Sequence, residues 1–159
     1  MNPILRLLKS LFKKINFNLH HIEPYDLDKE FPEASNFERE VFEMSAQYTM
    51  TSNERIFSLM KSIEFIKQNN VPGDFVECGV WRGGNLMIFQ RYIEKYNLKK
   101  KIYAFDTFEG MSEPDEIDLT YDGKSSIESL KKIEKSQIDR SENLLVAECS
   151  IEKVKENFK

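Results

Sequence analysis

Hydrophobic and polar positions in the N-terminal part of the chain follow the spacing of helices. Residues 1–17 carry apolar side chains at helical intervals with arginine and lysine between them, so we expect an amphipathic helix with a basic face. The following stretch, residues 18–35, is polar and contains two prolines, which predicts an irregular linker. A short helix and then a loop are expected over residues 36–50.

A longer helix is predicted over residues 51–71. Either Thr51 or Ser52 can cap its first turn, while Pro72 and Gly73 end it. Its apolar positions form one stripe that we expect to be buried, consisting of Ile56, Leu59, Met60, Ile63 and Ile66.

From residue 74 onward, short apolar runs alternate with helical segments. Strands are expected at residues 74–80, 100–108 and 142–150, and helices at residues 85–98, 125–138 and 151–158. This alternation predicts an α/β fold with right-handed crossovers and a parallel sheet that helices cover on both faces. We therefore divide the chain into an N-terminal helical and linker segment, residues 1–48, and an α/β domain, residues 49–159.

Composition and charge narrow the function classes. The 159 residues have a formal net charge of −4, which argues against the basic field of a nucleic-acid-binding protein. Cys78 and Cys149 are the two cysteines, and without a secretory signal they are expected to be reduced thiols in a cytoplasmic protein. No apolar run is long enough to span a membrane, but the basic helix of residues 1–17 could lie weakly on an anionic membrane surface or pack within the protein.

No metal ligands are assigned from the sequence. His20 and His21 are adjacent and have no third ligand nearby. The acids Asp115, Glu116 and Asp118 resemble a metal cluster, but they are expected to form the solvated face of a loop.

The stretch VPGDFVECGVWRGGN, residues 71–85, carries the candidate chemistry. Gly79, Gly83 and Gly84 follow the first expected strand and precede a helix. In an open parallel sheet, ligands bind at the carboxyl ends of the strands, where glycine allows close approach and the helix offers unpaired N–H groups. The alternative is a turn that only tightens the packing of strand on helix, with Trp81 as part of the core.

Two acids indicate which ligand this turn would accept. Glu77 stands where a dinucleotide fingerprint has its first glycine, and its charge would repel a pyrophosphate while suiting an ammonium or sulfonium. Asp106 ends the second strand, where nucleotide-binding proteins place an acid that accepts the ribose hydroxyls. Arg82 could receive a carboxylate. The pattern therefore favours a zwitterionic nucleoside such as S-adenosylmethionine over a dinucleotide.

Three segments, MTSNERIFSLMKSIEFI, VPGDFVECGVWRGGN and YAFDTFEGMSEPDE, closely resemble the macrocin and mycinamicin sugar O-methyltransferases (the TylF/MycF type). The resemblance covers residues 48–123, about half of the chain. It implies a Rossmann-like, S-adenosylmethionine-dependent enzyme that methylates a sugar hydroxyl of a glycosylated natural product or polysaccharide. It also implies a divalent metal, usually magnesium, and a homo-oligomer.

The resemblance assigns roles to individual residues. Met50, Thr51 and Ser52 would line the methionine end of the cofactor, although the last two could serve only as helix caps. The first cofactor motif would consist of Glu77, Gly79, Trp81, Arg82, Gly83 and Gly84. Asp106 would hold the ribose, with Thr107 and Phe108 beside the adenosine. Residues 109–123 would form part of a lid over the acceptor, and Glu148 and Cys149 could approach the adenine.

The resemblance also implies residues that this sequence lacks. Strand four and the segment after it carry the metal ligands and the catalytic base in the family, so we assign no catalytic residue and expect residues 1–159 alone to be inactive. One alternative is a noncatalytic half-domain that binds the nucleoside or pairs with another subunit. A nicotinamide-dependent oxidoreductase shares the alternating pattern, but Glu77 argues against it.

Overall fold

A computed structural model describes residues 27–120, 122–135 and 146–158. The chain divides into two compact units, Met1–Ser35 and Asn36–Lys159. In the first unit, the one-turn helix α2 (Leu27–Glu30) lies within the stretch that was expected to be an irregular linker. The expected basic helix of residues 1–17, together with His20 and His21, lies outside the described residues.

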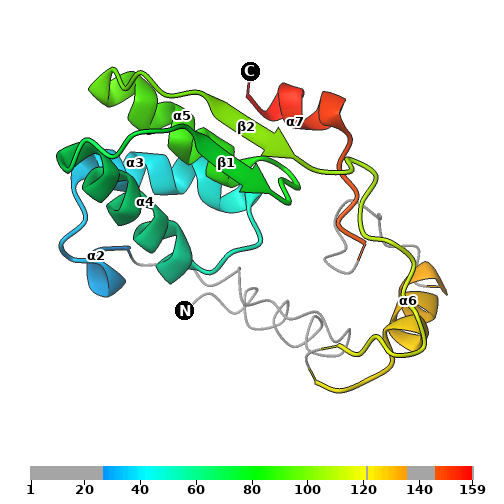
Figure 1. Ribbon diagram of the computed structural model, residues 1–159. Helices are drawn as coiled ribbons and strands as arrows, with labels where there is room; N and C mark the ends of the chain where they lie inside the picture. The colour runs from blue at the N-terminus through cyan, green and yellow to red at the C-terminus, as the bar shows by residue number, and fades with distance from the viewer. Residues whose placement is uncertain (1–26, 121, 136–145, 159) are drawn as a thin grey trace. The chain divides into compact units, whose positions relative to one another are not determined.

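The second unit contains the α/β part of the chain (Figure 1). Its elements are α3 (Asn36–Ser45), the 3-10 helix η1 (Ala46–Tyr48), α4 (Asn53–Gln68), β1 (Phe75–Cys78), α5 (Gly84–Tyr96), β2 (Ile102–Phe105), α6 (Ser126–Lys135) and α7 (Ile151–Asn157). Each helix expected after residue 35 is confirmed within the described residues. This unit includes α3 and η1, which the sequence-based division had placed in the N-terminal segment.

The two strands pair in parallel, and α5 is the connection between them. Their register runs from Phe75 opposite Ile102 to Cys78 opposite Phe105. A parallel pair requires such a crossover, and an α-helix commonly supplies it. The predicted α/β class with a parallel sheet is therefore confirmed.

The third predicted strand is wrong where it can be compared. Residues 147–150 have no regular secondary structure, and Val146 lies in a turn. Ala147 has a φ of 51°, a left-handed conformation that interrupts an extended run. The Val146 carbonyl instead accepts a hydrogen bond of 2.7 Å from the Met111 N–H, in the loop after β2. Residues 142–145 of this prediction lie outside the described residues.

Helices cover one face of the sheet and form the core with it. The Phe75 ring of β1 stacks on the Phe89 ring of α5, with centroids 4.6 Å apart. The predicted stripe of α4 contributes Ile56, Met60 and Ile63, each about 1% exposed. The carboxylate of Glu38 on α3, itself buried, pairs with Lys61 on α4 and links these two helices.

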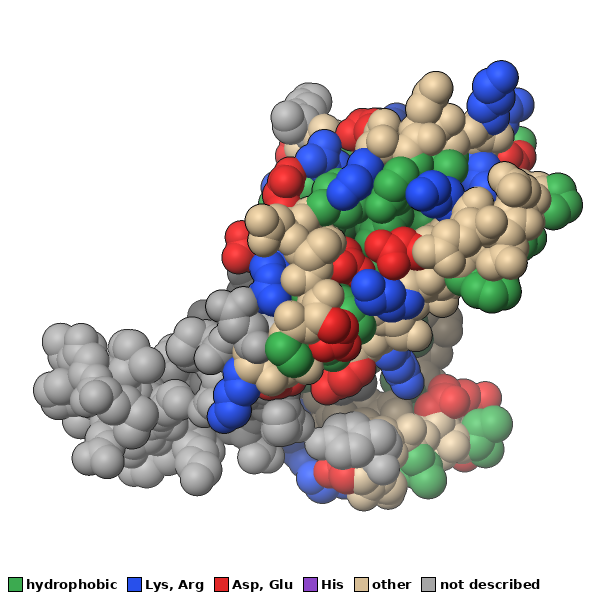
Figure 2. All heavy atoms as spheres, turned by 90° about the vertical axis from the view of Figure 1, so that its left-hand side faces the viewer, with side chains coloured by type: hydrophobic (Ala, Val, Ile, Leu, Met, Phe, Trp, Pro, Cys, Tyr) green, Lys and Arg blue, Asp and Glu red, His purple; other side chains and the backbone are tan. Residues whose placement is uncertain are grey.

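The opposite face of the sheet is exposed among the described residues, contrary to the expectation of helices on both faces. Val76 is 57% exposed, Tyr103 44% and Phe105 59%. These side chains share one face because side chains alternate along each strand and Val76 pairs with Tyr103. On another side of the molecule, acidic and basic side chains are interspersed around a small apolar patch (Figure 2).

Candidate functional site

Asp106 joins the end of β2 to the glycine turn, by which we mean residues 79–84. Its Oδ2 accepts hydrogen bonds from the backbone N–H groups of Val80 (2.5 Å) and Trp81 (3.1 Å), and its Oδ1 accepts one from Phe108 (2.8 Å). Burial acts to raise the pKa of Asp106, but these backbone hydrogen bonds outweigh it and hold the pKa below its usual value. The carboxylate therefore stays ionised and fixes the turn against the neighbouring strand.

The three glycines of the turn have different surroundings. Gly79, at φ 86°, has open space where a side chain would begin. A Cβ on Gly83 would meet the Phe158 ring at 2.9 Å, next to α7. A Cβ on Gly84 would lie 2.8 Å from the carbonyl oxygens of Ser45 and Tyr48. Only Gly79 thus leaves room for a ligand to approach the backbone, whereas the other two allow close packing of other elements.

The close approach at Gly84 sets the position of the segment 50–52. This segment directly follows η1, which packs on the first turn of α5 at Gly84. Ser52 occupies the N-cap position of α4, as predicted, but its side chain makes no capping hydrogen bond. The Thr51 hydroxyl lies 3.3 Å from the Thr49 hydroxyl. Capping by a side-chain hydrogen bond therefore does not account for these two residues.

Glu77 lies in β1, just before the glycine turn, and pairs with an amide. Asn85, in the first turn of α5, donates a hydrogen bond of 2.8 Å from Nδ2 to Glu77 Oε1. Glu77 Oε2 and Asn85 Oδ1 are buried and have no hydrogen-bond partner within the described parts of the chain. Burial raises the pKa of Glu77 to about 7, the Asn85 hydrogen bond opposes this rise, and the charge of Asp106 adds to it.

The side chains of Trp81 and Arg82 stack on each other within the glycine turn. The Arg82 guanidinium lies 4.6 Å from the centroid of the Trp81 ring. Trp81 has a φ of 49°, and its buried indole Nε1 finds no acceptor among the described residues. The Arg82 carbonyl accepts a hydrogen bond of 3.1 Å from Asn157 of α7.

Thr107 and Phe108 form a tight turn directly after Asp106. The Thr107 hydroxyl donates to the Gly110 carbonyl (3.1 Å) and accepts from the Glu109 N–H (3.3 Å). Phe108 has a φ of 57°. These contacts explain the local geometry, and the predicted adenosine contact of both residues stays a prediction.

Residues 146–149 lie along the same loop. A Cβ on Gly110 would meet the Val146 carbonyl oxygen at 2.5 Å and the Glu148 backbone at 3.2 Å. Cys149 is buried, and burial raises the pKa of its thiol. Glu148 and Cys149 thus lie beside the turn that follows Asp106, although no strand carries them.

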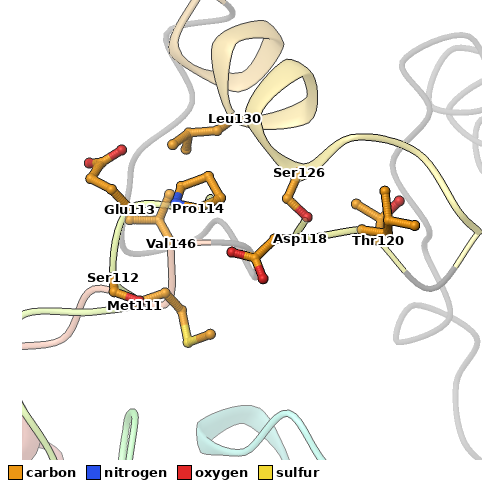
Figure 3. A pocket seen from close by; sticks show the side chains of 10 residues that line it. Met111, Ser112, Glu113, Pro114, Asp118, Thr120, Ser126, Leu130 and Val146 are labelled. Carbon is orange, nitrogen blue, oxygen red and sulfur yellow. The ribbon is translucent and has the colours of Figure 1, made fainter. Parts of the chain in front are cut away.

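The loop after β2 also lines a pocket of about 440 Å³ (Figure 3). Met111, Pro114 and Leu119 from the loop, Leu130 from α6 and Val146 give it apolar walls. Its polar lining consists of Ser112, Glu113, Asp118, Thr120 and Ser126.

The acids of this loop bond to their own backbone. Asp118 Oδ2 accepts a hydrogen bond from the Asp115 N–H (2.7 Å), and Asp115 Oδ1 accepts one from Glu116 (2.6 Å). Among the described residues, no group of three or more His, Cys, Asp or Glu side chains could hold a metal ion. In the same part of the chain, every helix is too short or too polar to cross a membrane.

The family model for macrocin O-methyltransferase (TylF) matches residues 8–159. The chain belongs to this family. The match confirms the resemblance drawn from three short segments and extends it to residues 8–159, nearly the whole of this chain.

Three relatives match about half of the chain or somewhat less. A tetracenomycin rhamnosyl 4'-O-methyltransferase from Streptomyces olivaceus is 34% identical over 70 residues, which are 43% of this chain and 27% of that protein. Demethyldecarbamoylnovobiocin O-methyltransferase from Streptomyces niveus is 30% identical over 81 residues, 50% of this chain and 31% of the relative. Mycinamicin III 3''-O-methyltransferase from Micromonospora griseorubida is 27% identical over 81 residues, 50% of this chain and 32% of the relative.

The matched segments thus span about a third of the length of these relatives. Among solved structures, the O-methyltransferase NovP is similar at 27% identity with a TM-score of 0.49, covering 70% of this chain and 41% of NovP.

Sequence reasoning missed Asn85. The signal was present, because a polar residue directly after Gly83 and Gly84 falls in the first turn of the following helix. That turn faces the end of β1, where Glu77 lies. An amide eight residues after an acid across a strand–turn–helix was therefore a candidate partner for the carboxylate.

Proposed function

We propose that this protein is part of an S-adenosylmethionine-dependent O-methyltransferase that acts on a hydroxyl of a sugar-containing small molecule. Family membership supports the reaction class. The relatives whose names specify a sugar position, a 4'-O-methyltransferase and a 3''-O-methyltransferase, support the acceptor class. The observation that carries the cofactor assignment is the half-buried Glu77 carboxylate, whose Oε2 is buried and has no hydrogen-bond partner among the described residues. Gly79, two residues further along, has open space where a side chain would begin.

The described residues fit the two ends of such a cofactor. Glu77 suits the positive charge of the amino-acid end. The segment 50–52, which is assigned to the same end, follows η1 near the start of α5. Among the described residues, Asp106 Oδ1 accepts one backbone hydrogen bond, from Phe108, and a carboxylate oxygen can accept a further bond from a ribose hydroxyl. When bound, S-adenosylmethionine supplies the methyl group, and the role of these residues is to bind and orient it.

The acceptor is assigned to the pocket lined by the loop after β2. Apolar walls with a few polar groups suit a glycosylated natural product, because sugar rings present both apolar faces and hydroxyls. This loop is the segment that the resemblance had assigned to a lid. The magnesium ion, the homo-oligomer, the membrane contact of residues 1–17 and the cytoplasmic location stay predictions.

A noncatalytic nucleoside-binding protein would use the same Glu77 and Asp106, so only methyl transfer separates it from an enzyme. A nicotinamide-dependent oxidoreductase would have to place a pyrophosphate beside Glu77, where a carboxylate repels it.

Calorimetric titration with S-adenosylmethionine, S-adenosylhomocysteine and NADH tests the cofactor assignment. We expect binding of the first two and none of NADH, and we expect Glu77→Gln to weaken S-adenosylmethionine binding by about tenfold or more. Glu128→Gln, which changes an acid in the first turn of α6, is the matched control and should bind normally. Binding of NADH alone would contradict the proposal. Transfer of a labelled methyl group to a rhamnosylated acceptor then tests the reaction itself.

A further inference from the structure

One face of the short helix α7 lies against the end of the glycine turn. Val154, Asn157 and Phe158 are spaced i, i+3 and i+4, which places their side chains on the same side of the helix. A Cβ on Gly83 would lie 2.9 Å from the Phe158 ring and 3.2 Å from Val154 Cγ1. Asn157 donates a hydrogen bond of 3.1 Å from Nδ2 to the Arg82 carbonyl, 75 residues earlier in the chain. This face of α7 therefore fits closely on the backbone of residues 82 and 83.

The first half of the turn is fixed separately, by β2. Asp106 Oδ2 accepts hydrogen bonds from the N–H groups of Val80 and Trp81. Trp81 itself has a φ of 49°, a left-handed conformation that is strained for a residue with a large side chain. Such a conformation persists only where the surrounding structure holds the backbone in place. Asp106 holds this strained backbone at the Trp81 N–H, and Asn157 holds it at the carbonyl of the next residue.

We propose that Asn157 is a positioning residue for cofactor binding, which acts by holding the Arg82 carbonyl and thereby the shape of the strained turn. This inference rests on the proposed function, which places the cofactor at the turn. Asn157 acts through the backbone of Arg82 and not through a contact with the ligand. The effect is reciprocal, because a ligand that favours the held shape of the turn must favour the packed position of α7 to the same extent.

Trp81 provides a direct signal of this positioning, because it is the only tryptophan of the chain. The Arg82 guanidinium lies 4.6 Å from the centroid of its ring, and its indole Nε1 is buried. A change in the backbone of the turn should therefore change how far acrylamide quenches the fluorescence of Trp81. In Asn157→Leu, which removes the amide donor without adding a charge, we expect stronger quenching than in the wild-type protein.

Asn69→Leu is the matched control for this variant. Asn69 makes the same kind of amide-to-carbonyl hydrogen bond, 2.9 Å to Phe65, at the exposed C-terminal end of α4. In calorimetric titration we expect Asn157→Leu to weaken binding of S-adenosylhomocysteine by about 5-fold to 20-fold, and Asn69→Leu to change it by less than about twofold. A merely structural role of Asn157 would lower the stability to urea in both variants and leave the Trp81 quenching and the ligand affinity unchanged.

Several outcomes would overturn the inference. Asn157→Leu with wild-type quenching and affinity would do so, as would altered quenching with wild-type affinity, and both results leave the proposed function intact. If Asn157→Leu does not fold, hydrogen exchange of the wild-type protein decides, because S-adenosylhomocysteine should slow amide exchange in residues 154–158. Slower exchange in residues 79–84 without any change in residues 154–158 contradicts the coupling. Failure of the wild-type protein to bind the ligand overturns the proposed function and this inference together.

Discussion

At the scale of single residues, the site depends on two acids whose environments differ in kind. Asp106 is surrounded by backbone N–H groups, which stabilise its charged form and lower its pKa. Glu77 is half-buried, and this burial together with the charge of Asp106 raises its pKa, while the hydrogen bond from Asn85 opposes the rise. Asp106 therefore stays charged and holds the turn in place, whereas Glu77 can change its protonation state when a cation binds.

Replacing Asp106 by asparagine should destabilise the protein. The amide would place an N–H group against at least one of the backbone donors of Val80, Trp81 and Phe108. We expect the free energy of unfolding to fall by about 2–3 kcal/mol, as measured by urea denaturation at pH 7. Asp74→Asn is a milder control, since its Oδ1 accepts one exposed backbone hydrogen bond from Lys101. Equal effects of both variants would contradict the anchoring role.

Glu77 should make folding stability fall as the pH rises through neutrality. Its folded-state pKa of about 7 lies above its ordinary value of 4.5, so the folded protein binds the proton more tightly. The resulting stabilisation is complete below pH 4.5 and is lost as the pH rises through 7. Relative to Glu77→Gln, the wild-type protein should therefore lose free energy of unfolding between pH 5 and 8. Parallel pH profiles of the two proteins would contradict the raised pKa.

The sequence indicated both acids because each stands at the carboxyl end of a short apolar strand. It did not indicate Asn85, since the amide becomes significant only when the turn brings it back to Glu77. The backbone bonds of Asp106 were also hidden, because they depend on the left-handed conformation of Trp81 and the turn at Phe108.

At the scale of elements, the start of α5 is where three separate segments meet. Carbonyls at the end of α3 and in η1 pack against Gly84, and α7 packs against Gly83. The glycine pair was expected to serve the cofactor directly. Its contacts show that it lets α7 and the segment before residues 50–52 pack close to the turn, and its cofactor role stays a prediction.

Gly84→Ala should test this arrangement. A Cβ would lie 2.8 Å from two backbone carbonyl oxygens, and backbone cannot move aside as a flexible side chain can. We expect the free energy of unfolding to fall by about 1–3 kcal/mol in urea denaturation, despite the better helix propensity of alanine. The matched control is Gln90→Ala on the exposed side of the same helix, which should change it by less than about 0.5 kcal/mol. An unchanged stability in Gly84→Ala would mean that η1 does not pack as described.

Helix periodicity and strand–helix alternation were sufficient to predict α3, α4, β1, α5, β2, α6 and α7. The pattern failed at residues 146–150, where an apolar run resembled a strand. The left-handed Ala147 and the hydrogen bond from Met111 to Val146 belong to a loop contact that no local pattern reveals.

At the scale of the whole molecule, the described part of the sheet has one covered face and one exposed apolar face. The exposed face is formed by Val76, Tyr103 and Phe105. In most soluble proteins, a group of neighbouring apolar side chains such as this one is covered by other structure. The sequence predicted strands that are apolar on both faces, and the exposed apolar residues agree with this. It could not show which face the helices of this chain would cover.

This exposed face should bind a hydrophobic dye. We expect the wild-type protein to increase the fluorescence of 8-anilinonaphthalene-1-sulfonate, and Val76→Thr with Phe105→Thr to reduce that increase by at least about twofold. Phe65→Thr is the control, because Phe65 is equally exposed (62%) but lies on α4 away from this face. A similar reduction in the control, or no dye binding by the wild type, would contradict an accessible apolar sheet face.

The most direct test of the central claim is to map the cofactor on the chain by backbone amide chemical shifts. S-adenosylhomocysteine should cause its largest shifts in residues 79–85 and 106–108, and Glu77→Gln should abolish them at the same ligand concentration. Shifts confined to the pocket between the loop after β2 and α6, or no shifts at all, would contradict a cofactor site at the glycine turn.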